Sequence, residues 1–346
     1  MPQNISKRIN WSRVEEYLRK ELNLMDEVGE LEVRPFTSGY SNLTYLVRIG
    51  QWEGVLRRPP FGELPAKAHD MKREYNLLKR IYSVYPKAPK PLLYCEDPNI
   101  MDRHFYVMEF KKGAVLDKYL PANWNNPQIK QQISKAFIQE LVDLHNIDVY
   151  KNNLDSLGKP EGFLKRQVNG WIQRYRQSKT DDLPFVAKVE NWLVDNIPNS
   201  TDVTIIHNDF KLNNIMFNPE NPNQITAVLD WEMSTIGDPL LDLAISLAYW
   251  TEEGDEETGL TAVTNQPGFM TRRELAILYT EASGRDISNL NYYLSFAFYK
   301  IAAVLQQIYY RYKSGEVDDE RFANLNIGIK NLMLQAEKAT QKNNIL

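Results

Sequence analysis

Hydrophobic and polar positions divide the 346-residue chain into a strand-rich beginning and a helix-rich remainder. Short apolar runs that are bounded by turn residues are typical of strands, whereas apolar residues at a spacing of three and four are typical of helices. Five runs predict one antiparallel sheet, at residues 31–37, 43–49, 54–57, 92–95 and 104–110. Helical spacing predicts helices at residues 11–22, 68–83, 128–146, 162–177, 183–196, 238–250, 272–283, 290–313 and 319–340.

The polar segment Lys111-Lys112-Gly113 separates these two parts. We therefore expect an α+β fold of two lobes, with a small antiparallel-sheet lobe at residues 1–110 and a larger, mainly helical lobe at residues 111–346. A chain of this length can give both lobes a well-filled core. The clearest helix start is Asp238, because its side chain can cap a helix whose first position is Pro239.

A group of polar residues lies among short apolar runs in the second lobe. Three short strands are predicted there, at residues 203–206, 214–217 and 225–229. Asp209 and Asn214 follow the first strand at a spacing of five, and Asp230 ends the last one. A loop and hairpin of this kind can place the three side chains around one small volume.

These residue types at this spacing indicate phosphoryl transfer. In protein kinases one carboxylate receives the acceptor hydroxyl, while an asparagine and a second aspartate hold magnesium on the nucleotide phosphates. Asp209 is the predicted catalytic carboxylate, and Asn214 and Asp230 are the predicted Mg²⁺ ligands. Lys211 would contact the moving phosphoryl group, because this reaction needs alignment and positive charge. His207 is expected to orient the loop and not to carry protons.

The pattern His-x-Asp-x-x-x-x-Asn at residues 207–214, followed by Leu-Asp-Trp-Glu at 229–232, resembles the aminoglycoside-phosphotransferase (choline-kinase-like) superfamily, which shares the protein-kinase fold. Three stretches are similar to a narrower branch, the kinase domains fused to or encoded beside acyl-CoA dehydrogenases: residues 144–148, 158–163 and 271–285. The resemblance implies a protein-kinase-like two-lobed fold, ATP as the phosphoryl donor, Mg²⁺, and a small-molecule hydroxyl acceptor.

The resemblance also implies a nucleotide site in the first lobe. Residues 38–47 look like the family's nucleotide loop, where Gly39 leaves room for backbone amides to approach phosphates. The predicted contacts of this loop are Ser38, Gly39, Ser41 and Asn42. A plain hairpin turn is the alternative. Residues 105–110 look like the hinge, where the backbone of Glu109 and Phe110 would meet the adenine, so the side chains do not separate ATP from GTP.

The strand at residues 54–57 occupies the place where kinases put a lysine on the α- and β-phosphates. Here the residue is arginine, with Arg57 expected to face the phosphates and Glu74 to be its partner. Neighbouring residues of a strand face opposite sides, so only one of Arg57 and Arg58 is expected to face inward. The alternative for Glu74 is a solvated helix carboxylate.

Two further residues bear on the loop around Asp209. Asn208 stands where many relatives have glycine, and asparagine tolerates the left-handed backbone that such a position needs. Asp242 could accept hydrogen bonds from the backbone of the same loop, although an ordinary helix carboxylate is the alternative.

The acceptor is indicated by less specific features. The acidic run at residues 251–257 could attract a cationic acceptor, but a solvated mobile loop is the expectation. Aromatic residues at helical spacing between 292 and 312 are expected to be mostly core, with a few able to line an apolar pocket. The branch resemblance implies a hydroxylated acyl compound as the acceptor.

Composition narrows the remaining possibilities. The formal net charge of −4 gives no basic surface for nucleic acid, and no apolar run reaches the length that spans a membrane. A single cysteine, Cys95, excludes an internal disulfide and fits a reducing cytoplasm. We therefore expect a cytoplasmic, Mg²⁺- and ATP-dependent small-molecule O-kinase. The alternatives are an aminoglycoside, macrolide or amino-alcohol kinase, and a non-catalytic nucleotide-binding module that regulates a partner.

Overall fold

The computed structural model describes residues 9–36, 42–62, 70–199, 202–260 and 262–341. The chain forms two compact units, which we call the first and the second unit. The first unit contains the chain up to Gly113 together with Thr226–Glu232, and the second contains Ala114–Ile225 and the chain from Met233 onward. The segment Thr226–Glu232 therefore belongs to the first unit although it comes much later in the sequence.

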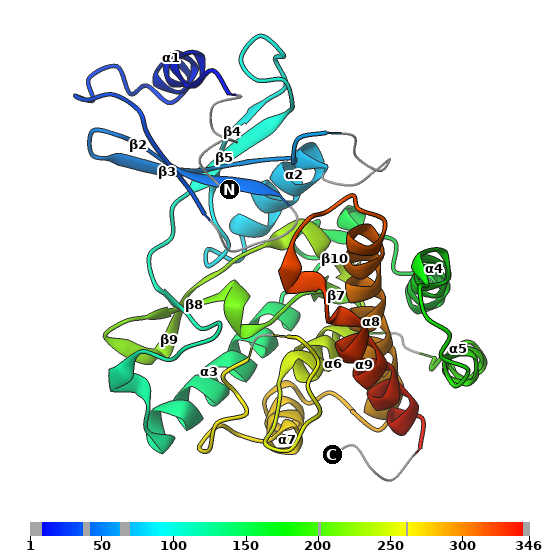
Figure 1. The fold of residues 1–346 in the computed structure, drawn as a ribbon. Helices are drawn as coiled ribbons and strands as arrows, with labels where there is room; N and C mark the ends of the chain where they lie inside the picture. Colours follow the sequence, from blue (N-terminus) through cyan, green and yellow to red (C-terminus); the bar gives the residue numbers. More distant parts are fainter. Residues whose placement is uncertain (1–8, 37–41, 63–69, 200–201, 261, 342–346) are drawn as a thin grey trace. The chain divides into compact units, whose positions relative to one another are not determined.

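The first unit is built on a five-stranded antiparallel sheet (Figure 1). Its strands, in spatial order, are β1 (Glu32–Pro35), β2 (Leu43–Ile49), β3 (Trp52–Arg58), β5 (Phe105–Glu109) and β4 (Pro91–Cys95). β2 and β3 pair from Leu43 opposite Arg58 to Ile49 opposite Trp52, so they form one long hairpin. The predicted five-stranded sheet is confirmed.

Two helices accompany this sheet, α1 (Trp11–Glu21) and α2 (Met71–Tyr82). α1 buries Val14 and Leu18 against inward residues of β2 such as Tyr45 and Val47. α2 contacts β4 and β5. Each helix begins after a side chain that accepts a backbone N–H, Asn10 for α1 and Asp70 for α2, which is the usual preference at a helix start.

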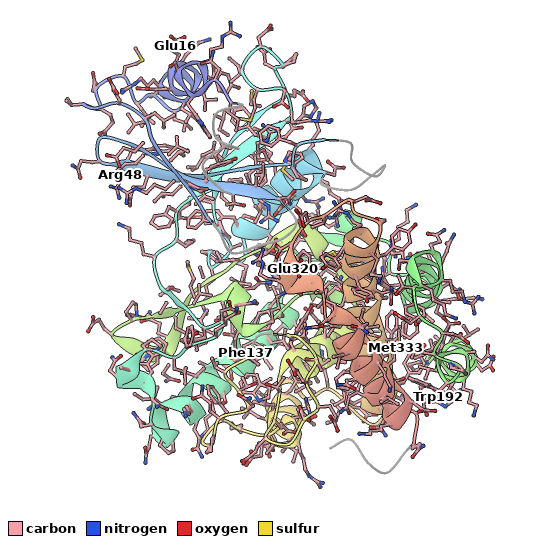
Figure 2. All side chains as sticks on the ribbon, in the orientation of Figure 1. Glu16, Arg48, Phe137, Trp192, Glu320 and Met333 are labelled. Carbon is pink, nitrogen blue, oxygen red and sulfur yellow. The ribbon has the colours of Figure 1, made fainter. Side chains whose placement is uncertain are left out.

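The second unit is mainly helical. Its helices are α3 (Pro127–His145), α4 (Phe163–Ser178), α5 (Val186–Asp195), α6 (Pro239–Tyr249), α7 (Arg272–Ser283), α8 (Leu290–Lys313) and α9 (Leu325–Ala339). α8 contacts α4, α6 and α9, and its tyrosines and phenylalanines up to Tyr309 are buried, as expected for core residues. Phe137 of α3, labelled in Figure 2, is buried with its ring 4.9 Å from that of Phe210 and 5.3 Å from that of Trp250.

Two small sheets position the polar loop between the helices. β7 (Thr204–Ile206) pairs with β10 (Thr235–Gly237), and β8 (Ile215–Asn218) lies between β6 (Ala114–Val115) and β9 (Asn221–Val228). β9 begins in the second unit and ends in the first. The polar residues that end β7 are therefore held between a short sheet and the helical core.

Most predicted helices are present within a few residues of their expected ends. Asp238 caps α6 by accepting the N–H of Leu240 at 2.9 Å, and Pro239 is its first residue, as predicted. The helix predicted at residues 319–340 begins later than expected, because a short 3-10 turn (Glu320–Phe322) precedes α9. Asn324, just before α9, has a φ of −109°, which interrupts the helix. Among the described residues, no helix is both long and apolar enough to cross a bilayer.

Candidate functional site

Asp209, Lys211 and Asn214 lie together in the loop after β7, which we call loop 207–214. The carboxylate Oδ2 of Asp209 is 2.9 Å from the Lys211 ammonium and accepts a hydrogen bond from Asn214 Nδ2 at 3.0 Å. Asn214 Nδ2 also donates to the Asp209 carbonyl at 2.9 Å. The Lys211 ammonium lies 4.7 Å from the centre of the Tyr249 ring. The Tyr249 hydroxyl also hydrogen-bonds with Asp209. The Asp209 side chain is 20% exposed, so it is held by its neighbours and still open to a reactant.

Asp242 holds the backbone at the start of this loop. Its Oδ2 accepts the N–H of His207 at 2.6 Å, and its Oδ1 accepts the N–H of Asn208 at 2.7 Å. The predicted hydrogen bonds from loop to Asp242 are therefore confirmed, and the carboxylate is fully buried. His207 is also fully buried, with its ring 6.0 Å from that of Phe210, which agrees with a structural role.

His145 connects Asp242 to the surrounding helices. Its Nε2 is 3.2 Å from Asp242 Oδ2, and its Nδ1 is 2.8 Å from the Tyr279 hydroxyl. Arg285 donates to the carbonyl of His145 at 2.8 Å. His145 and Arg285 belong to two of the stretches that resemble the acyl-CoA-dehydrogenase-linked branch. Those two stretches therefore contact each other, and His145 supports loop 207–214 through Asp242.

The buried Asp242–His145 pair makes stability depend on pH. Burial alone would raise the pKa of Asp242, but the hydrogen bond with His145 and the nearby imidazoles lower it, and burial lowers the pKa of His145. The Asp242 carboxylate therefore contributes stability above about pH 4, which is lost as the pH falls through its folded pKa. Neutral His145 contributes stability above about pH 6.5 that is lost on acidification. Both groups destabilise the fold in acid.

We expect Asp242→Asn to lower both stability and turnover. An amide in place of the carboxylate leaves one backbone N–H of the loop without an acceptor, which costs roughly 1–3 kcal/mol of unfolding free energy at pH 7. Urea denaturation at neutral and acidic pH measures the loss, which should be largest at neutral pH. Glu190→Gln is the control, because Glu190 is a buried carboxylate that accepts from Tyr299 and Arg176 away from the loop. Equal turnover of the two variants would contradict a specific role for Asp242.

Asn208 adopts the left-handed backbone predicted for it, with φ of 65°. Its Nδ2 donates to the carbonyl of Met233 at 3.0 Å, which ties the loop to the segment that leads into β10. The sharp turn at Asn208 brings the next residue, Asp209, out of line with β7.

A second polar cluster lies in the first unit around Arg57, and we call it the Arg57 cluster. Arg57 Nη2 is 2.7 Å from Asp230 Oδ1 and 2.9 Å from Glu232 Oε2, and Arg57 Nε is 3.4 Å from Glu74 Oε2. Asn42 Nδ2 donates to the same Glu232 oxygen at 2.7 Å. One guanidinium thus contacts three carboxylates, and the predicted pair of Arg57 with Glu74 is present.

The Arg57 cluster has more carboxylates than cations, and this changes the pKa of Glu74. Glu74 is almost fully buried on α2. Burial raises its pKa to about 7, with Arg57 opposing the change and the Asp230 and Glu232 carboxylates adding to it. Glu74 therefore gains a proton near neutral pH more readily than an ordinary glutamate.

Glu232 was not among the site residues that the sequence predicted. Its contacts with Arg57 and Asn42 join residues that are far apart in the chain. The signal available in the sequence was its place as the last residue of the motif Leu-Asp-Trp-Glu, two residues after Asp230. This position alone does not distinguish a carboxylate that belongs to a site from one that is exposed to solvent.

Arg57 and Arg58 contact separate sets of partners, as expected for neighbouring residues that face opposite sides of β3, although both are buried. Arg58 donates to Asp102 Oδ1 at 2.8 Å, and its guanidinium lies 4.1 Å from the centre of the Phe61 ring. A loop aromatic and a carboxylate therefore cover the second face of β3. The choice of Arg57 for the phosphates stays a prediction.

The other predicted nucleotide contacts are described only in part. Ser38, Gly39 and Ser41 lie outside the described residues. Glu109 ends β5, where its N–H donates to the Lys90 carbonyl at 2.8 Å. Its carboxylate is 2.9 Å from the Lys111 ammonium. The N–H of Glu109 is thus already bonded within the first unit. Phe110 follows, with its ring 6.5 Å from that of Phe36. The role of these hinge residues stays a prediction.

The predicted metal ligands belong to different units. Asn214 lies in the second unit and Asp230 in the first, so their common volume with Asp209 stays a prediction. In the described part of the chain, no group of three or more His, Cys, Asp or Glu side chains is arranged to hold a metal ion. The donor types nevertheless fit Mg²⁺, which prefers carboxylate and amide oxygens. Asn214 uses its nitrogen on Asp209, so its Oδ1 is the atom that would bind a metal ion.

The acidic run after α6 is more than a solvated loop. Glu252 Oε2 is 3.1 Å from Arg272 Nη1, and Asp255 also pairs with Arg272. Arg272 is buried at the start of α7. Two carboxylates of the run are therefore neutralised within the second unit, which weakens the run as a binding surface for cations.

The fold has close neighbours among solved structures. A Ralstonia eutropha protein assigned to the aminoglycoside phosphotransferases matches with a TM-score of 0.79 at 27% identity, over 95% of this chain and 98% of that one. Choline kinase from Cryptosporidium parvum matches with a TM-score of 0.65 at 15% identity, over 95% and 96%. An aminoglycoside phosphotransferase in complex with ADP and hygromycin B matches with a TM-score of 0.59 at 12% identity, over 96% and 99%. These matches define a kinase-like phosphotransferase fold, as predicted.

Comparison of the sequence with protein families identifies the family of this chain. The model of the phosphotransferase enzyme family matches residues 32–274, which is most of the chain. The chain belongs to this family. It is also 33% identical to acyl-CoA dehydrogenase family member 11 from Homo sapiens, over 94% of this chain but only 43% of that protein. The chain therefore spans less than half the length of this relative, and the predicted branch is confirmed.

Proposed function

We propose that the protein is an Mg²⁺- and ATP-dependent kinase of small molecules that phosphorylates a hydroxyl group, with a hydroxylated acyl compound as its acceptor. The observation that carries the proposal is the arrangement of loop 207–214. There the Asp209 carboxylate lies 2.9 Å from the Lys211 ammonium and 3.0 Å from the Asn214 amide. A phosphotransferase family and fold agree with this chemistry.

In the proposed reaction the acceptor oxygen forms a bond to the γ-phosphorus of ATP, and the bond from that phosphorus to the ADP oxygen breaks. The acceptor proton passes to Asp209, whose carboxylate is partly exposed. Lys211 and Arg57 would lie against the phosphate charge that spreads during transfer. Bound by Asn214 and Asp230, Mg²⁺ would neutralise phosphate oxygens.

ATP and Mg²⁺ are supported by analogy and by donor chemistry. A neighbour of the same fold has been solved with ADP. The residues of this chain contribute oxygen donors suited to Mg²⁺ at Asn214 and Asp230 and a guanidinium suited to phosphate at Arg57. The cytoplasmic location remains a prediction from the cysteine content.

The acyl acceptor is favoured over a cationic antibiotic or an amino alcohol. The relative that matches over nearly the whole chain is named as an acyl-CoA dehydrogenase family member. In the second unit, Lys300 interacts with two other cations, Lys211 and Arg174, and with two carboxylates, Asp209 and Asp242. Cations outnumber carboxylates in this group, which disfavours a polycation. Two carboxylates of the acidic run, which would otherwise attract a cation, already pair with Arg272.

A coupled assay of ADP release tests this proposal. Hydroxyacyl-CoAs, free hydroxy acids, amino alcohols and aminoglycosides are supplied in turn with Mg²⁺ and ATP, and Asp209→Asn serves as the blank. We expect acceptor-dependent ADP release with the hydroxylated acyl compounds, and kcat/KM for them about 10²-fold or more above that for aminoglycosides, which is a difference of about 2.7 kcal/mol in transition-state binding.

The other outcomes point to the alternatives. Turnover with aminoglycosides or amino alcohols alone would keep the kinase chemistry and reject the acyl acceptor, and protection of a sensitive host from an antibiotic would support the same conclusion. Nucleotide binding with no ADP release above the blank for any acceptor would favour a non-catalytic regulatory module.

A further inference from the structure

Lys300, in the middle of α8, is a buried lysine without a carboxylate partner. Its side chain is almost fully enclosed, and the residue is 4% exposed. Its ammonium Nζ donates to the carbonyl of Asn208 at 3.1 Å, with the Asn208 side-chain oxygen at 3.4 Å. Its Nζ also lies 5.7 Å from the centre of the Trp171 ring of α4, which packs against α8 (Figure 1). Among the described residues it forms no ion pair.

Burying an ammonium on neutral partners is costly, so core packing alone does not account for this residue. An isolated charge loses its hydration free energy on burial, and hydrogen bonds to a carbonyl and an amide oxygen compensate for only part of this loss. A leucine or methionine would fill the same space between α8 and α4 without that cost. A charge kept in such a place is a candidate for a role in the neighbouring loop.

The partner of Lys300 is the peptide that leads directly into Asp209. The carbonyl of Asn208 and the N–H of Asp209 belong to one planar peptide, so holding the carbonyl fixes the direction in which Asp209 leaves the turn. The N–H of Asn208 is already held by Asp242 at 2.7 Å, and its side-chain nitrogen by the carbonyl of Met233 at 3.0 Å. Lys300 supplies the remaining support, on the carbonyl side, for a residue in the left-handed region with φ of 65°.

We propose that Lys300 is a positioning residue for the reaction. Its ammonium orients the peptide between Asn208 and Asp209 and thereby aims the Asp209 carboxylate at the acceptor hydroxyl. This inference rests on the proposed kinase function, because it assigns Lys300 to the same loop. Lys300 acts through Asn208 and does not itself contact the reacting atoms.

The charged groups around Lys300 give the role a pH dependence. They are Asp209 and Lys211 on loop 207–214, Asp242 on α6 and Arg174 on α4. Burial lowers the pKa of Lys300 to about 8, with Asp209 and Asp242 opposing the change and Arg174 and Lys211 adding to it. Above this pH the neutral amine holds the carbonyl less firmly, so kcat is expected to decline.

Steady-state kinetics of Lys300→Met, against Lys130→Met as the matched control, test the proposal. Lys130 is likewise a buried lysine of the second unit that donates to one backbone carbonyl, that of Pro267, at 3.1 Å, with its Nζ 5.9 Å from the Phe269 ring. We expect kcat of Lys300→Met to fall about 10- to 100-fold, the effect of losing a hydrogen bond from a charged group, with KM for ATP within about twofold. Lys130→Met should keep the wild-type kcat.

The pH profile separates positioning from simple packing. Wild-type kcat should decline above about pH 8 toward the level of the variant, whereas Lys300→Met should show no such decline. Lys300→Gln, which is also uncharged, replaces Lys300→Met if that variant does not fold. A wild-type kcat in both uncharged variants would overturn the inference.

Hydrogen exchange of the peptide covering residues 207–211 gives a second readout that needs no acceptor. Exchange there should be faster in Lys300→Met than in the wild type, and unchanged in Lys130→Met. Equal exchange in all three proteins would overturn the inference. If the wild-type protein phosphorylates no acceptor, the proposed function fails, while this measurement still decides whether Lys300 orders the loop.

Discussion

Asp209→Asn is expected to lower kcat about 10²- to 10⁴-fold, the usual contribution of a positioned general base. Asparagine keeps the size of the side chain and can still accept a hydrogen bond from Asn214 or Lys211, so the loop should keep its shape. It cannot accept the acceptor proton. ATP affinity, measured by calorimetry, should stay within a few-fold of the wild type, and the loss should appear in single-turnover rates.

Asp148→Asn is a suitable control for this variant. Asp148 is another loop carboxylate of the second unit, and it accepts the backbone N–H groups of Tyr150 and Lys151. Its replacement should change kcat by less than about twofold, because surface changes of this kind usually cost little. Near-normal turnover of Asp209→Asn would remove Asp209 from the mechanism.

Arg57→Met should have the largest effect on stability. The Arg57 guanidinium is 9% exposed and contacts Glu74, Asp230 and Glu232, so its loss leaves a buried carboxylate and two neighbouring ones without their cation. Breaking a buried charge pair by removing one partner costs about 3–5 kcal/mol. Urea denaturation of the purified protein, followed by circular dichroism, measures the loss.

The loss of unfolding free energy in Arg57→Met should increase as the pH rises. A glutamate whose folded pKa is raised contributes stability below its unfolded pKa and loses it as the pH rises through the folded value, which is about 7 for Glu74. Without Arg57 this pKa rises further, so the destabilisation of the variant relative to the wild type should be larger at pH 8 than at pH 5.5. Arg48→Met is the control, since Arg48 is 36% exposed and pairs with Glu53 next to the turn of the β2–β3 hairpin. A surface pair of this kind contributes about 0–1 kcal/mol. Equal losses in the two variants would contradict the assigned burial cost.

The elements that could be predicted from the sequence are those with a long, regular pattern. The five strands of the first unit and helices such as α7 and α8 carry enough apolar positions to define a face. β6, β7 and β10 have two or three residues each, and β6 and β10 were not predicted, because so short a strand has no pattern of its own. Their pairing depends on where the rest of the chain brings them.

Part of the candidate site could also be predicted, because spacing and helix geometry limit its local contacts. The loop carries Asp209, Lys211 and Asn214 within six residues, and they do lie together. The bonds of Asp242 to the loop followed from a carboxylate in the first turn of a helix that begins beside it.

Glu232 and Lys300 could not be predicted in the same way. Glu232 meets Arg57 from 175 positions away, and Lys300 meets Asn208 from 92 positions away. A lysine within an aromatic-rich helix has the same local pattern whether it reaches solvent or a buried carbonyl. Only the packing of α8 against its neighbours shows that Lys300 reaches a buried carbonyl and not solvent.

The late segment Thr226–Glu232 completes the first unit. Trp231 packs with its ring 5.7 Å from that of Tyr85, Val228 donates to the Lys87 carbonyl at 3.0 Å, and Arg73 donates to the Glu232 carbonyl at 2.8 Å. A fragment that stops at Gly113 would therefore lack an aromatic wall and two of the carboxylates that neutralise Arg57. The first unit cannot be excised as a contiguous piece, and during synthesis it cannot be completed until the ribosome has translated the chain as far as Glu232.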